Sequence, residues 1–144
     1  MKADELAVRV EMQVDQMRRN IAKLASSLFN LTTSTPEDAD CPIGPKFSEV
    51  VFGGILETGE KCWQEKYLLE AHVILKNPLI PDKKARLVSL AHTWHRTAVV
   101  LGQQRKVTGV RPMISVMEAE VRLTALLSVT DYLESILERL DDDE

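Results

Sequence analysis

The side chains best suited to bind a transition metal are three histidines and two cysteines. His92 and His95 are three residues apart, so on a helix they share one face. With His72 or Cys62 they could coordinate zinc, whose usual ligands include imidazole and thiolate. Structural zinc sites generally use two closely spaced ligand pairs, and the second pair is missing. We therefore expect no metal and no cofactor, and Cys41 and Cys62 are expected to be free thiols.

Two other spacings are typical of hydrolytic enzymes. Glu57-x-x-Glu60 resembles the first half of the magnesium site of all-α nucleotide pyrophosphohydrolases, where four carboxylates from two helices hold the metal. The second half does not follow on the next helix, because Asp82 is the only acidic residue from 71 to 117. Arg86 and His92, in the order R-x5-H, resemble the pair of the HEPN ribonucleases, although RLVSLAH lacks the polar residue that usually follows the arginine. A small α-helical nuclease or nucleotide hydrolase around Arg86, His92 and His95 is thus an alternative, and the main prediction is a protein that is not an enzyme.

Charge is distributed unevenly along the chain. Residues 82–111 contain seven basic residues and one acidic residue, whereas residues 112–144 contain two basic and nine acidic residues. One interpretation is that these two segments lie side by side and neutralise each other. Another is that the basic segment binds the phosphates of a nucleic acid, with an affinity that falls steeply with salt. The candidate phosphate contacts are Lys83, Lys84, Arg86, Arg96, Arg105, Lys106 and Arg111.

The N-terminal segment carries the clearest structural pattern. Apolar residues recur there at alternating spacings of three and four, which predicts one long helix over about 4–31 with a narrow apolar seam. Asp4 is expected to cap its N-terminus. One helix of a small core does not need so long a seam, so part of it is expected to bury against another copy of the chain. The predicted oligomer interface is Val10, Val14, Met17, Ile21, Leu24, Leu28 and Leu31.

Three further helices are predicted over about 60–76, 82–106 and 112–140, followed by a frayed acidic tail at 141–144. The first ends at Asn77-Pro78, and Asp82 caps the next one. Three glycines at 53, 54 and 59 each cost about 1 kcal/mol inside a helix. We therefore expect a break or kink near 53–60, and a strand or hairpin at 47–58 is the alternative.

The predicted fold is all-α: an antiparallel four-helix bundle or a pair of helical hairpins, formed by one domain of 144 residues and assembled into a homo-oligomer. The first dozen residues are too charged for a secretory signal, and no apolar stretch is long enough to span a membrane. A cytoplasmic location without membrane contact is expected. The aromatic residues are expected to anchor the core or an interface rather than to stack on bases; they are Trp63, Tyr67, Trp94 and Tyr132.

The stretch SLAHTWHRTAVVLGQQRKVTGVRP at 89–112 resembles the oligomerisation region of some bacteriophage terminase small subunits. This resemblance covers about a third of the chain. It implies a mostly helical protein that assembles into rings, binds viral DNA and passes it to a packaging motor without catalysing a reaction. That family usually has an N-terminal helix-turn-helix, which the uninterrupted seam over 4–31 replaces here. DNA recognition would then fall to the segment 83–111.

The sequence therefore predicts a non-catalytic helical protein that assembles with copies of itself and binds nucleic acid through its basic segment. The alternative in another class is a heteromeric adaptor, in which the acidic C-terminal segment docks on a basic protein partner.

Overall fold

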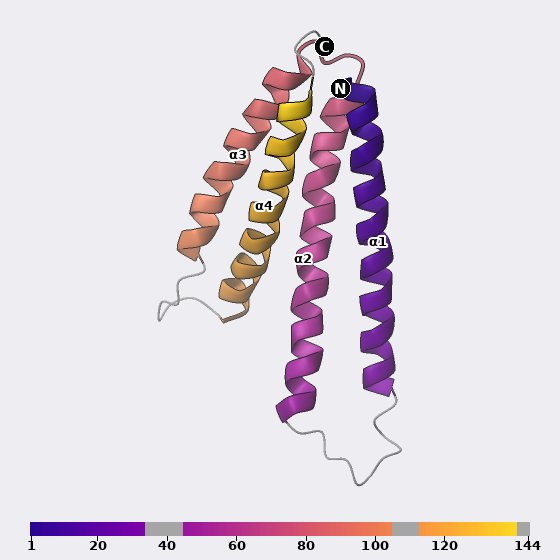
Figure 1. Cartoon of the computed structure of the whole chain (residues 1–144). Helices are drawn as coiled ribbons and strands as arrows, with labels where there is room; N and C mark the ends of the chain where they lie inside the picture. Colours follow the sequence, from indigo (N-terminus) through magenta and orange to yellow (C-terminus); the bar gives the residue numbers. More distant parts are fainter. Residues whose placement is uncertain (34–44, 105–112, 141–144) are drawn as a thin grey trace.

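The computed structural model describes residues 1–33, 45–104 and 113–140, with side chains over 1–30, 53–104 and 116–140. Within these ranges the protein is all-α, as predicted. Its helices are α1 (Ala3–Thr33), α2 (Pro45–Lys76), α3 (Lys83–Gln104) and α4 (Met113–Arg139). They form two antiparallel hairpins, α1–α2 and α3–α4, and α4 packs on α2 (Figure 1). The N-terminus and the end of α4 lie at the same end of the molecule, where the Met1 amino group donates a 2.8 Å hydrogen bond to the Arg139 carbonyl.

The helix ends follow local chemistry. The Ala85 amide donates to the Asp82 carboxylate at 3.0 Å, which confirms Asp82 as the cap of α3. Asp4 is not a cap, because the first backbone bond runs from Leu6 to the Lys2 carbonyl and places Asp4 inside the first turn. There its carboxylate still lies at the positive end of the helix dipole. The end of α2 at Lys76, directly before Asn77-Pro78, is also confirmed.

The predicted break near 53–60 is wrong, and so are the alternative strand at 47–58 and the start of this helix at 60. One continuous helix runs from Pro45 to Lys76. Two of its glycines lie where neighbouring helices approach closely. A Cβ at Gly54 would lie 2.7 Å from Leu28 of α1, and one at Gly59 would lie 3.4 Å from Val121 of α4. These close approaches add packing that offsets the low helix propensity of glycine.

The core lies in the half of the molecule near the start of α1 and the end of α4, where all four helices contribute side chains. Val10, Leu75, Leu87 and Leu126 are 0% exposed there. Tyr67 and Trp94 are also buried, with their rings 5.6 Å apart in an edge-to-face arrangement, so they are core residues as predicted. The Trp94 indole donates to Glu70 at 3.1 Å, which satisfies its one polar atom.

Candidate functional site

The basic residues predicted to bind phosphate have different environments on α3. Lys83 is half-buried, and its ammonium donates a 2.8 Å hydrogen bond to the Leu75 carbonyl at the end of α2. Lys84 is half-buried and also has an interaction partner. The hydrogen bond from Lys83 therefore joins the start of α3 to the end of α2. The remaining candidates in the loop, Arg105, Lys106 and Arg111, lie outside the described residues.

Arg86 and Arg96 are the two α3 candidates whose side chains are exposed. They are ten residues apart, which separates them by about 15 Å along the helix. Over Lys83–Gln104 the sequence contains no acidic residue. The outward side of α3 thus presents two arginines that could contact two phosphates. They are two of the seven basic residues that the sequence predicts as phosphate contacts.

The structure does not assemble the histidines into a metal site. His72 bonds Glu11 at 2.8 Å, and His95 lies 3.6 Å from Glu134 on α4. No three His, Cys, Asp or Glu side chains of the described residues lie together in a way that would hold a metal ion. Cys62 is an exposed free thiol, and Cys41 falls outside the described ranges.

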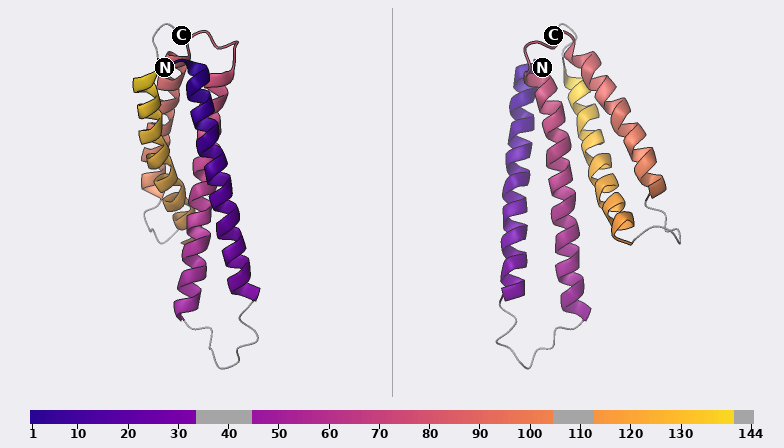
Figure 2. Two further views of the ribbon diagram at one scale, coloured as in Figure 1. Left: turned by 45° about the vertical axis from the view of Figure 1, so that its right-hand side comes forward. Right: turned by 180° about the vertical axis from the view of Figure 1, so that it is seen from behind.

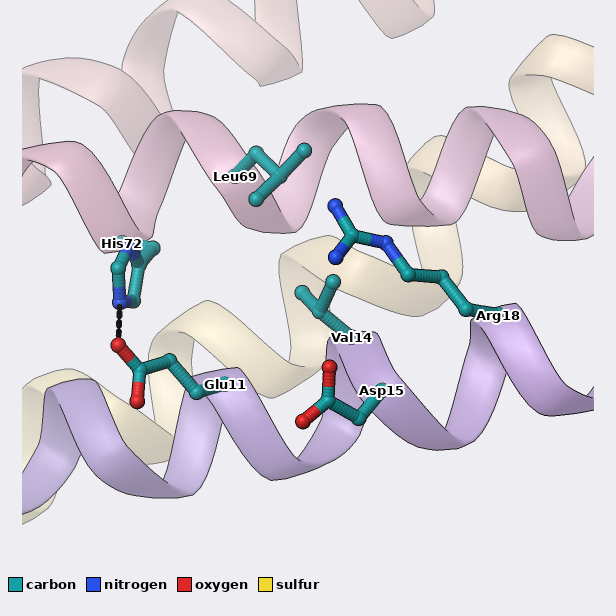
Figure 3. A pocket seen from close by; sticks show the side chains of 6 residues that line it. All are labelled: Glu11, Val14, Asp15, Arg18, Leu69 and His72. Carbon is teal, nitrogen blue, oxygen red and sulfur yellow. Dashed lines mark hydrogen bonds and ion pairs between the residues drawn. The ribbon is translucent and has the colours of Figure 1, made fainter.

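A cavity of about 280 Å³ lies between α1 and α2, and it is bordered by charged side chains at both ends (Figure 3). At one end Glu11 accepts bonds from His72 at 2.8 Å and from Lys76 at 3.0 Å. At the other end Arg18 donates to Glu65 at 2.6 Å. The bonds from Lys76 and His72 lower the pKa of the Glu11 carboxyl, and Glu65 raises the pKa of Arg18. These contacts join α1 to α2 and leave the Glu11 and Glu65 carboxylates already bonded to cations.

The predicted oligomer seam of α1 divides into two parts. Val10 and Val14 are 0% and 3% exposed in the core of a single chain, so they are not available to a second copy. Met17, Ile21, Leu24 and Leu28 are half-buried. The side chain of Leu31 is outside the described set. The candidate interface is therefore the second half of the predicted seam.

Leu24 and Leu28 of this second half lie in a part of the α1–α2 hairpin that we call the arm, residues 24–33 of α1 and 45–58 of α2. Figures 1 and 2 show α3 and α4 leaning away from it, so that both helices of the arm extend past the start of α4. Phe29 is 66% exposed and Ile55 is 55% exposed. The arm contains three charged residues, Lys46, Glu49 and Glu57, in 24 positions, against 28% for the whole chain.

An apolar groove of about 380 Å³ opens between α2 and α4 next to the arm. At its edge the Trp63 ring has the Lys66 ammonium at 4.8 Å and the Arg122 guanidinium at 4.6 Å from its centre. Arg122 also donates a 2.6 Å hydrogen bond to the Tyr67 hydroxyl. The groove is lined by Ile55, Leu56, Gly59, Trp63, Met117, Glu118 and Val121.

No protein-family model, no curated protein and no solved structure matches this chain. The resemblance of residues 89–112 to terminase small subunits stays a prediction. None of the helices in the described ranges has the length and hydropathy of a membrane span.

Sequence reasoning predicted the α1 half of the arm as an interface but missed its α2 half and the groove. A signal for the arm was present, because residues 24–33 and 50–56 contain no charged side chain. Depletion of charge is the compositional mark of an interface centre. The groove had no such signal, since it depends on the contact of α4 with the middle of α2.

Proposed function

We propose that this protein is a non-catalytic α-helical assembly protein whose copies associate through the arm. The observation that carries the proposal is a contrast within α1: the apolar side chains of its seam are buried in the core but only half-buried in the arm. A two-helix hairpin cannot fully cover its own apolar seam, and a second hairpin would complete a four-helix arrangement.

A second copy of the chain is the occupant that the arm fits best. The sequence of the arm contains only three charged residues in 24 positions, so two copies can approach with little repulsion and with few charges to bury. The exposed Phe29 and Ile55 supply large apolar side chains of the kind found at interface centres. A symmetric dimer uses the same patch on both copies, and this patch is compatible with itself.

The test is the mass of the protein in solution, measured by light scattering after size exclusion. Wild type is expected to run as an oligomer at tens of micromolar, and Phe29→Glu is expected to weaken association at least tenfold, because it places a charge in the apolar contact. Met12→Glu is the matched control, since Met12 is 64% exposed on α1 outside the arm. A wild-type protein that stays monomeric at several hundred micromolar would refute the proposal.

A second candidate function is binding of nucleic acid by α3, favoured by the exposed Arg86 and Arg96 on a helix that has no acidic residue. The resemblance to terminase small subunits implies the same activity. A mobility-shift titration that compares Arg86→Ala/Arg96→Ala with wild type tests it. The double variant should bind more weakly, and the slope of the logarithm of its affinity against the logarithm of the salt concentration should be less steep by about two. Wild-type binding that is absent in 50 mM salt, or unchanged between 50 and 200 mM salt, would exclude this function.

A further inference from the structure

The α3–α4 hairpin presents two parallel rows of exposed side chains, one on each helix. Both rows have successive spacings of four, three and four residues, which keep their members on one side of a helix. Their apolar members are well exposed: Val88 at 39%, Val99 at 63% and Leu127 at 52%. The α3 row is Val88, His92, His95 and Val99, and the α4 row is Leu127, Asp131, Glu134 and Glu138.

The two rows lie next to each other on the same face of the hairpin. His95 Nε2 is 3.6 Å from Glu134 Oε1, and these side chains are 58% and 55% exposed. Because the helices run antiparallel (Figure 1), the rest of each row extends along the same surface on either side of this contact. We call this surface the paired-row face.

The charges on the paired-row face differ between its two helices. The α4 row contributes three carboxylates, Asp131, Glu134 and Glu138. The α3 row contributes no carboxylate, and the exposed Arg96, which follows His95 in the sequence, adds a positive charge next to it. One half of the face is therefore acidic, and the other half has no acidic side chain and carries an arginine beside it.

We propose that the paired-row face binds the same face of a second copy, with α3 of each chain lying on α4 of the other. Two symmetric ways of stacking the hairpins exist. A two-fold axis parallel to the helices places α3 opposite α4, whereas an axis across the helices places α4 opposite α4. The first brings the α3 half of each copy, with Arg96 and no carboxylate, onto the acidic half of the other, and the second opposes three carboxylates to three carboxylates. Charge thus selects the first arrangement.

This inference rests on the proposed function, since it names a second contact of the same assembling protein. The paired-row face and the arm belong to different hairpins, so one chain can use both. Two different symmetric contacts on each chain generate assemblies larger than a dimer, either closed or open-ended. The arm contact is apolar and is expected to persist in high salt, whereas the paired-row contact should weaken as salt screens its charges.

The experiment uses two full-length variants that leave the His95–Glu134 contact in place. Asp131→Lys/Glu138→Lys makes the α4 row basic, and His92→Glu/Arg96→Glu makes the α3 side of the face acidic by adding one carboxylate to the α3 row and replacing the neighbouring arginine by another. Each variant should lose the paired-row contact with itself, because like charges then face each other. In a 1:1 mixture, a basic row meets an acidic row at both places, so the contact should return. Arg86→Glu, on α3 outside the row, is the control.

Masses are measured by sedimentation in 50 and 500 mM salt, after circular dichroism confirms native helicity. Wild type and Arg86→Glu should form a larger assembly in 50 mM salt, and each row variant alone should stop at the arm assembly. The mixture should regain the wild-type mass. A row variant that reaches the wild-type mass by itself, or a mixture whose mass is no larger than that of either variant alone, overturns this inference. If the arm assembly is still present in that case, the proposed function stands. A wild-type monomer in both salts refutes both.

Discussion

The two ends of α1 have similar sequence patterns but different environments. Near the N-terminus, Val10 and Val14 lie in the core, where α1 meets α2 and residues of the second hairpin. Farther along, Leu24 and Leu28 continue the same spacing but stay half-buried, because α3 and α4 lean away from the arm (Figure 2). This difference shows that a repeating apolar seam specifies a helix with one apolar face. The number of neighbouring helices then decides whether a given turn of that helix becomes part of the core or remains a contact surface.

The largest expected effect on stability comes from truncating one leucine in the core and, for comparison, one leucine in the arm. Leu75→Ala, at a position that is 0% exposed, should lower the free energy of unfolding by about 2–5 kcal/mol, because it leaves a cavity in a closed core. Leu24→Ala, at a half-buried position in the arm, should cost about 1 kcal/mol or less in the monomer. Urea unfolding at low protein concentration measures both. Equal losses would show that the arm is as tightly packed as the core.

A smaller effect of opposite sign is expected at two adjacent glycines of the arm. Gly53→Ala meets no atom within 4 Å and should stabilise the protein by about 0.5–1 kcal/mol through helix propensity. Gly54→Ala brings its Cβ to 2.7 Å from the end of Leu28, which must shift, so the gain should be cancelled or reversed. Thermal unfolding distinguishes the two. A stabilised Gly54→Ala protein would mean that α1 and α2 are loosely packed in the arm.

The smallest effect concerns the charged contacts that join α1 to α2 near the core. The pKa of Glu11 is lowered in the folded protein by its bonds from Lys76 and His72. A carboxyl with a lowered pKa adds stability above its unfolded pKa, and this stability is lost as the pH falls through the folded pKa. Glu11→Gln should therefore be slightly less stable than wild type at pH 7, and this difference should shrink as the pH falls through the lowered pKa of Glu11. Urea midpoints at pH 7 and pH 3 measure this, and a difference that is as large at pH 3 as at pH 7 would contradict it.

Most helix ends could be predicted, because they depend on neighbours in the chain. Asp82 accepts a bond three residues away, and Asn77-Pro78 ends α2 through local geometry. The continuity of α2 through Gly54 and Gly59 could not be predicted, since its support comes from Leu28 and Val121, which are distant in sequence. For the same reason, charge alone did not reveal that Lys83 bonds the end of α2.

The sequence by itself determined that the chain is helical, where three of its helices lie, and that charge separates onto its last two helices. Periodicity and composition act over a few turns, so they can be read locally. The tertiary structure decided which part of the α1 seam is core, which basic residues face outward, and which rows of α3 and α4 lie together. Those properties depend on how the two hairpins meet, and side chains far apart in the chain set that geometry.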